Sequence, residues 1–171
     1  MKKEIAGVIT LFTVLGGMVA ASPVHGEPSS LLKKALIDDA MPYINIRLGC
    51  ELNTEKRKQL YQKTTQLMHK VMGKNPEVTV VHIMESEHQQ WAVNAVELSP
   101  TKPVGAYVDI KVTEGTNTPE EKAIMIKETV EMLKNTAGVI QEACYVVIHD
   151  IPANSWGYNG KTQEERASKR S

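Results

Sequence analysis

The chain has 171 residues with 20 basic and 20 acidic side chains, and aromatic residues make up only 5% of it. A neutral balance with few aromatics gives no electrostatic footprint for nucleic acid, so we expect no nucleic-acid partner. The length suits one well-buried domain and is not comfortable for two. Histidines and cysteines are scattered without the spacing of a metal site, and we expect neither a metal nor a cofactor.

The first 26 residues have the layout of a secretory signal peptide. A short basic start is followed by an apolar, uncharged run, and small residues offer cleavage sites after Ala21 or after Gly26. The alternative is an uncleaved membrane anchor, although the run is short for the roughly 20 apolar residues that a bilayer requires. We therefore expect a periplasmic or secreted protein without membrane contact after cleavage, in which residues 27–41 form a segment ahead of the fold.

The rest of the chain is similar to itself. A shift of 64 residues, or 65 towards the end, superposes like residues in the same order over about 55 positions, which is typical of an internal repeat. The matched pairs include Tyr43 with Tyr107, Ile46 with Ile110, Lys58 with Lys122, Met68 with Met132, Trp91 with Trp156 and Asn94 with Asn159.

Each repeat has the pattern of a strand, a helix and a second strand. The first strands alternate around isoleucine and valine, and the second strands are more continuously apolar. This order predicts a parallel pair joined by a right-handed crossover. In chain order we expect a strand at 43–48, a helix near 54–72, a strand at 78–84, a strand at 107–112, a helix near 118–137 and a strand at 143–148.

Local signals mark the helix ends. Thr118, Pro119 and Glu121 give an N-cap, a proline at the first helical position and a capping-box glutamate. Gly73 and Gly138 are expected to end the two helices. The spacing of three and four predicts apolar faces made of Leu60, Thr64, Leu67 and Val71 in the first helix and of Ala123, Ile126, Val130 and Leu133 in the second.

The domain organisation follows from these elements. Residues 42–98 and 105–162 form the two repeats, a proline-stiffened connector at 99–104 joins them, and residues 163–171 form a charged tail. Side by side, two such units make one four-stranded sheet with both helices on one face. The opposite face is expected to be apolar, which predicts an oligomer.

Two segments resemble the family of 4-oxalocrotonate tautomerase. One is Met41-Pro42-Tyr43-Ile44-Asn45-Ile46, which is similar to the start of those chains. The other runs from Ile148 to Gly160 and is similar to their last strand and closing hairpin. The resemblance implies an α+β, tautomerase-like fold in which two β-α-β repeats form one four-stranded mixed sheet with two helices on one face. It also implies a homotrimer of such fused chains.

The resemblance makes Pro42 the candidate catalytic base, because the relatives lose the methionine and use the exposed proline. An N-terminal proline is a rigid secondary amine, and an apolar pocket disfavours its ammonium form, so its pKa falls toward neutrality. It can then carry a proton between carbon and oxygen of a small keto or enol acid. An internal proline has an amide nitrogen and cannot do so. The expected isomerase activity therefore requires Pro42 to become the N-terminus, since its counterpart at position 106 is alanine.

The resemblance also implies the substrate-binding residues. Trp91 and Trp156 occupy the position of the family's aromatic pocket wall, although either can equally be a core tryptophan. Arg47 is the candidate cation, with Lys111 as its counterpart, unless both belong to a solvated strand face. The places where relatives acting on dicarboxylates carry arginines hold none here, so that specificity is not expected; these places are Leu52, Thr116, Val80 and Tyr145.

Several alternatives stay open. The chain is either an enzyme or an exported, non-catalytic binding protein with this fold, and the fold alone does not decide. Cys50 and Cys144 either form a disulfide or are two small buried residues. His149 and Asp150 are neighbours in a strand and point to opposite faces, so both are expected to be structural.

Overall fold

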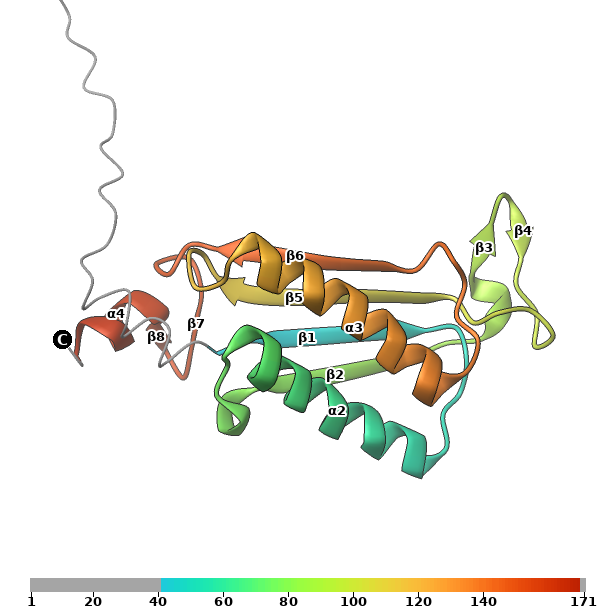
Figure 1. Ribbon diagram of the computed structural model, residues 1–171, viewed down its shortest axis with the longest axis horizontal. Coiled ribbons are helices and arrows are strands. Elements are labelled where there is room, and N and C mark those ends of the chain that lie inside the picture. The colour runs from blue at the N-terminus through green and yellow to red at the C-terminus, as the bar shows by residue number, and fades with distance from the viewer. Residues whose placement is uncertain (1–40, 170–171) are drawn as a thin grey trace, which may run out of the picture.

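The computed structural model describes residues 41–169, so the predicted signal peptide and residues 27–40 lie outside the described part. Figure 1 shows a four-stranded sheet with two long helices on one face, ordered β2-β1-β5-β6. This confirms the expected α+β architecture. The strands are β1 (Tyr43–Leu48), β2 (Val80–Glu85), β5 (Ala106–Thr113) and β6 (Tyr145–Ile151), and the helices are α2 (Thr54–Met72) and α3 (Pro119–Ala137).

Strand pairing follows the repeat. Each repeat pairs its own two strands in parallel, and the repeats join through β1 and β5, which run antiparallel. In that register Tyr43 lies opposite Lys111, and Leu48 lies opposite Ala106. The start of β1 and the end of β5 therefore share one end of the sheet, called here the Pro42 end. The end of β1 and the start of β5 share the other, called the Ala106 end.

The helix boundaries agree with the local signals. Thr118 accepts from the Glu121 amide while the Glu121 carboxylate accepts from the Thr118 amide, which completes the predicted capping box. Gly73 ends α2 in the left-handed conformation, at φ 64°. The second strand of the first repeat begins later than expected, because Asn75 caps a short 3₁₀ helix at Pro76–Val78. The second strand of the other repeat starts and ends later, at Tyr145–Ile151.

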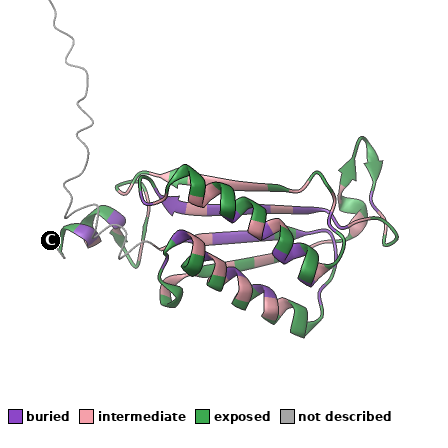
Figure 2. Ribbon diagram, viewed as in Figure 1, coloured by how far each residue is buried: buried purple, intermediate pink, exposed green. Residues whose placement is uncertain are grey.

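The core lies between the helices and the two central strands, which are the most buried in Figure 2. In α2 the buried residues are Leu60, Thr64, Met68 and Met72, while Leu67 and Val71 pack partly against the core. The prediction of the buried face of α3 is wrong except for Leu133. That helix is rotated so that Ile126 is exposed and the buried residues are Met125, Thr129, Met132, Leu133 and Thr136.

The open face of the sheet is not apolar, contrary to expectation. Asp109 at its centre accepts from the Tyr107 hydroxyl (3.1 Å), lies 2.8 Å from His149 Nε2 and pairs with Arg47 (3.5 Å). Burial raises the pKa of Asp109, but the hydrogen bonds from His149 and Tyr107 outweigh burial and hold it below its ordinary value. Among the described residues, the large apolar side chains that are exposed on this face belong to the edge strands, and they are Val80, Met84 and Tyr145. Any partner on this face must therefore match a polar centre with an apolar rim.

A small hairpin lies at each end of the sheet (Figure 1). After a 3₁₀ turn at His88–Gln90, β3 (Ala92–Val93) and β4 (Val96–Glu97) form one at the Ala106 end. At the Pro42 end β7 (Gly157–Tyr158) and β8 (Lys161–Thr162) form the other. The segment expected to be a charged tail begins with a short helix, α4 (Gln163–Ser168), whose Gln163 and Ala167 are buried.

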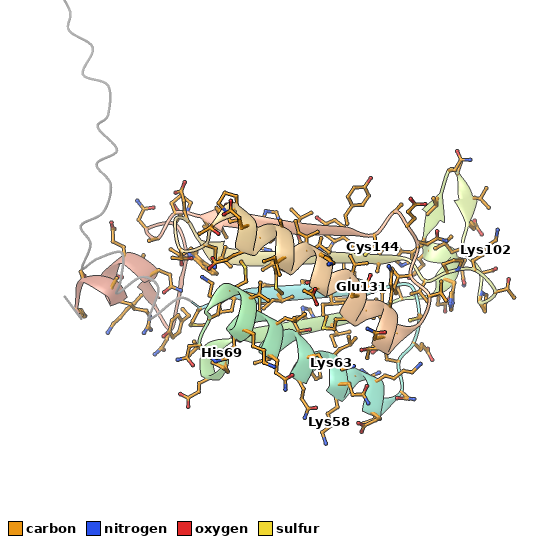
Figure 3. All side chains as sticks on the ribbon, in the orientation of Figure 1. Lys58, Lys63, His69, Lys102, Glu131 and Cys144 are labelled. Carbon is orange, nitrogen blue, oxygen red and sulfur yellow. The ribbon has the colours of Figure 1, made fainter. Side chains whose placement is uncertain are left out.

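Polar contacts also tie the repeats together. Lys63 of α2 donates to the Thr136 hydroxyl of α3 (3.2 Å), and Figure 3 shows Lys63 on the helix layer. Lys74, which follows α2, is 1% exposed and donates to the Thr116 hydroxyl (2.8 Å) in the loop after β5. Burial lowers the pKa of Lys74 to about 8. A buried lysine thus links the first repeat to the second at the Pro42 end.

The two cysteines are free thiols, as in the second of the two alternatives. Cys50 is buried after β1, and Cys144 lies at the start of β6 (Figure 3), both in contact with the core. Burial raises the pKa of both thiols, which keeps them protonated and unreactive. Within residues 41–169 there is no helix with the length and apolar character needed to cross a bilayer.

Candidate functional site

A cavity of about 310 Å³ lies at the Pro42 end of the sheet. Its walls come from the beginnings of β1 and β2, the end of β5, the second hairpin and α4. The first and second repeats therefore build it jointly, as the antiparallel β1–β5 pairing requires. The lining residues are Met41, Pro42, Tyr43, Val80, Lys111, Trp156, Gly157, Tyr158 and Gln163.

Pro42 is buried at the start of β1. Its carbonyl accepts from the Val80 amide of β2 (3.2 Å), so the edge of the sheet fixes the ring beside the cavity. Met41, which is partly buried, occupies the neighbouring part of the wall. Removing Met41 would expose the Pro42 nitrogen at the cavity as a secondary amine.

Among the described residues, Lys111 is the one charged residue in the wall of this cavity. It comes from β5 and lies opposite Tyr43 in the sheet, with its ammonium 5.5 Å from the centre of the Tyr43 ring. That arrangement is a cation–π contact and leaves the three N–H donors of the ammonium without a carboxylate among the described residues. The described lining of the cavity therefore carries one positive charge and no carboxylate.

The second hairpin closes the cavity. Gly157 permits its tight pairing, because a Cβ there would collide with the Lys161 carbonyl. Arg166 of α4 stacks 3.5 Å from the Tyr158 ring centre and donates to the Tyr158 carbonyl (3.0 Å), which holds that aromatic wall in place. The Trp156 carbonyl accepts from the Gln163 amide (3.0 Å). The Trp156 indole Nε1, in contrast, is buried without a hydrogen-bond partner.

The structure does not bring Trp91 and Arg47 to this cavity, although both were candidate substrate-binding residues. Trp91 covers Gly49 and Gly105 at the Ala106 end, and its Nε1 donates to the Ser86 hydroxyl (2.8 Å). Arg47 is on the open face of the sheet, where it donates to Asn45 (3.0 Å). Pro42 and Trp156 do share a cavity, and that is the pair for which the sequence indicates a composite site.

A larger cavity of about 480 Å³ lies at the Ala106 end and has the opposite character. Carboxylates of Glu51, Glu85 and Glu87 line it, together with Arg57. Arg57 donates to Glu85 (2.6 Å), and this bond holds the pKa of the Glu85 carboxyl below its usual range. The excess of negative charge makes it a poor site for an organic acid. The described residues contain no cluster of side chains that could hold a metal.

Sequence reasoning did not assign Tyr158 and Gln163 to the site, and it named Lys111 only as the counterpart of the candidate cation Arg47. A signal existed for Lys111, because a two-repeat sheet with antiparallel central strands places the end of β5 beside the start of β1. Another existed for Gln163, since Thr162 and Glu165 have capping-box spacing and form that box. His149 and Asp150 point to opposite faces as expected, with His149 beside Asp109 and Asp150 paired to Lys122 (2.6 Å).

The fold is that of the tautomerase and migration-inhibitory-factor structures. Native fused 4-OT superposes with a TM-score of 0.64 at 18% identity, over 72% of this chain and 97% of that chain. A macrophage migration inhibitory factor-like protein from Entamoeba histolytica superposes with a TM-score of 0.60 at 18% identity, over 71% of this chain and 97% of the other. At these identities the likeness concerns the fold.

Sequence comparison then gives the family. The family model described as "Tautomerase enzyme" matches residues 42–99 and 107–166, one match per repeat. The chain also shares 43% identity over 54 residues with "Probable tautomerase K2" of Dickeya dadantii (strain 3937), which is 31% of this chain and 81% of that protein. The chain belongs to the tautomerase family.

Proposed function

We propose that this protein is an isomerase that moves a proton between oxygen and carbon of a small keto or enol acid, with the amine of an N-terminal Pro42 as the base. The observation that carries the proposal is the placement of Pro42 in the wall of a cavity whose described lining residues include one cation and no carboxylate. Family membership supports the reaction class. The proposal requires the bond between Met41 and Pro42 to be absent in the active form.

The surroundings of Pro42 suit a neutral amine. Tyr43, Val80, Trp156 and Tyr158 present mostly apolar surface, which disfavours an ammonium by desolvation. Lys111 adds a like charge on the same wall, which disfavours the ammonium further. Both effects favour the unprotonated amine that a base needs near neutral pH.

The proposed reaction needs only this one shuttling group. In the enol-to-keto direction the Pro42 nitrogen removes the hydroxyl proton, and the carbonyl forms as the electron pair moves toward carbon. The resulting Pro42 ammonium returns the same proton to the adjacent carbon. Atoms and charge balance, and the amine is regenerated for the next turnover.

The test compares two purified proteins that differ by one residue, one beginning at Pro42 and one beginning at Met41. Both present a free amine, but only the first presents it on proline. On an enolisable aryl keto acid we expect the Pro42 form to be faster by about a hundred- to ten-thousand-fold, the range of general-base contributions. A form beginning at Glu27 should be as slow as the Met41 form.

Pro42→Ala in the active form separates the roles of the amine and the ring. The variant keeps an N-terminal amine, so it should retain part of the activity while losing the rigid secondary amine. Equal rates for the Pro42 and Glu27 forms would show that another group is the base. If all forms are inactive, the protein is a non-catalytic, tautomerase-fold binding protein.

We further propose that the chain is exported and that three fused chains assemble. The structure named "F6 fused 4-OT wild type asymmetric trimer" has a TM-score of 0.63 at 20% identity and supports the proposed assembly of three chains. Sedimentation of the Pro42 form at micromolar concentration should report three chains, and a stable monomer would refute the assembly. Intact mass of the protein recovered from its native compartment would identify its first residue.

A further inference from the structure

We infer that Lys111 and the indole N–H of Trp156 bind the carboxylate of a substrate that has one carboxylate and an apolar, aryl-sized remainder. The inference rests on the proposed function, because it concerns the same cavity and names its substrate class and specificity residues. It assigns the charge recognition to β5 and the second hairpin, whereas Arg47 and Trp91 have no part in it.

Lys111 is suited to this role because no described carboxylate forms a direct ion pair with it, and it acts on Asp109 only at longer range. Its described contact is the face of Tyr43, and neither an ion pair nor a hydrogen bond within residues 41–169 uses its ammonium. Arg47, its counterpart in the first repeat, pairs with Asp109 and donates to Asn45. The two equivalent cations therefore differ: one is engaged within the fold, and the other lines a cavity.

Trp156 supplies a second donor with no partner. Its Nε1 is buried without an acceptor, and a buried N–H that lacks a hydrogen bond is destabilising. In the other repeat the same N–H donates to Ser86. The counterpart of Ser86 is Ile151, which has no acceptor in its side chain. This N–H has almost no exposed surface in the free protein, so a ligand oxygen would satisfy it only after the ring turns toward the cavity.

The rest of the wall sets the size and charge of the ligand. Among the described lining residues, one cation is available for one carboxylate. Arg166 does not line the cavity: it stacks on the Tyr158 ring and donates to the Tyr158 carbonyl, although its buried Nε has no partner among the described residues. The side chains of Tyr43, Val80 and Tyr158 offer mainly apolar surface, and the cavity volume of about 310 Å³ admits a single aryl group with a short chain. A second carboxylate would have no cation to meet it.

Binding can be measured without turnover. The chain has two tryptophans, so Trp91→Phe leaves Trp156 as the only indole reporter. In the form beginning at Pro42, which matches the extent of the fused relatives, we would titrate 3-phenylpropionate and follow Trp156 fluorescence. Lys111→Met in this background should weaken binding by about tenfold or more, since a charge-assisted contact is lost. The neutral amide, 3-phenylpropionamide, should bind both proteins equally weakly.

Matched controls come from the other repeat. Arg47→Met should leave the affinity for 3-phenylpropionate unchanged, and Lys111→Arg should restore most of it. Trp156→Phe, measured by calorimetry with Trp91 intact, removes the N–H and keeps a ring, and should weaken binding by about threefold to tenfold. Trp91→Phe should not weaken it. Calorimetry on the otherwise natural chain replaces fluorescence if Trp91→Phe fails to fold.

The outcomes separate this inference from the proposed function. Equal affinity of the Lys111→Met and parent proteins for the acid, or equal affinity of the parent for acid and amide, would overturn it. An unchanged affinity in Trp156→Phe would overturn the indole contribution. Lys111-dependent binding without turnover in the Pro42 form would support the inference while refuting the proposed reaction.

Discussion

The two ends of the sheet are built from equivalent residues and differ in what their tryptophans do. At the Pro42 end Trp156 borders an open cavity, its indole N–H has no acceptor and a cation lies in the same wall. At the Ala106 end Trp91 lies over two glycines, and its N–H is bonded to Ser86. The same residue at the same repeat position is thus a pocket wall in one place and packing in the other.

The neighbours of each ring explain the difference. Gly49 and Gly105 leave room for Trp91 to lie against the backbone, where their own hydrogen bond (2.8 Å) joins the two segments. Their repeat counterparts are Thr113 and Met41, which carry side chains where Gly49 and Gly105 have none. The residues around an aromatic position, more than the aromatic residue itself, decide whether a pocket forms. The following predictions test this contrast.

The largest expected effect comes from deleting the two rings. Trp91→Ala should destabilise the protein by about 3 kcal/mol, because it empties a packed position. Trp156→Ala should cost about 1 kcal/mol, since that ring already borders a cavity and its N–H is unbonded. Urea unfolding of both variants measures the difference. Equal losses would mean that the two ends are packed alike.

A larger side chain at Gly105, at the Ala106 end, should reduce the stability of the fold almost as much. A Cβ at Gly105 would lie 2.6 Å from the Trp91 ring, so Gly105→Ala should destabilise by about 2 kcal/mol through overpacking. Activity should be retained, because the Pro42 cavity is at the opposite end. Trp91→Leu in the same chain should relieve most of the clash. A Gly105→Ala cost that is unchanged in the Trp91→Leu background would place the strain elsewhere.

The buried lysine at the Pro42 end predicts a pH effect of similar size. Burial lowers the pKa of Lys74 from 10.5 to about 8, whereas its counterpart, Val139, is exposed and cannot titrate. Between these values the unfolded chain binds more protons than the folded one, so stability should rise with pH. Urea unfolding at about pH 7.5 and about pH 10 should show a gain of roughly 2 kcal/mol attributable to Lys74.

Lys74→Met is the control for this titration. It removes the ammonium and keeps a chain of similar length, so the pH-dependent gain should disappear from the difference between the two proteins. Comparing the variant with the parent at each pH cancels the other groups that titrate in this range. A parent and variant that change in parallel would show that Lys74 is not desolvated.

A smaller effect is expected from the hydroxyl that holds Trp91. Ser86 accepts from the Trp91 indole (2.8 Å) and donates to the Leu48 carbonyl (3.0 Å). Ser86→Ala should therefore destabilise by about 1 kcal/mol without changing activity. Ser155→Ala, which alters an exposed hydroxyl bonded to its neighbour Asn154, should have almost no effect in the same thermal-unfolding measurement. A Ser86→Ala variant as stable as the parent would contradict the assigned hydrogen bonds.

The smallest effect concerns the two hairpin turns. Ala95 has a φ of 58°, in the left-handed region, whereas glycine occupies the equivalent position 160 at φ 72°. Ala95→Gly should stabilise by about 0.5 kcal/mol because glycine adopts this conformation without steric cost. Gly160→Ala should destabilise the second hairpin by about 1 kcal/mol for the same reason. Thermal unfolding measures whether each variant is more or less stable than the parent. A decrease in stability in Ala95→Gly would contradict the steric explanation.

Features set by neighbours in sequence, and the sheet that the repeat implies, could be predicted, whereas details of packing between distant residues could not. The capping box at Thr118 and the helix end at Gly73 depend on a few adjacent residues, and both are present. The buried face of α3 depends on how that helix rotates against β5 and β6, and its apolar spacing did not reveal the shift to Met125 and Thr129.

The candidate site shows the same limit. Pro42 and Trp156 could be named because each lies in a recognisable motif. The close packing of Trp91 at the other end depends on glycines some 40 residues before and 14 residues after it, whose close approach no local pattern reveals. The polar open face depends on Asp109 meeting Arg47 and His149 from neighbouring strands, which alternation along one strand does not indicate.

The connector that makes one chain of two repeats also has a topological consequence. Ala106 is the counterpart of Pro42 but follows Gly105 through a peptide bond, so its nitrogen is an amide in every molecule that keeps both repeats. A polypeptide has one amino terminus however many repeats it contains. Any base that depends on a terminal amine is therefore limited to one per chain. A reagent that modifies this amine reacts with one group per two-repeat chain. The Ala106 end therefore cannot supply a second base of this kind.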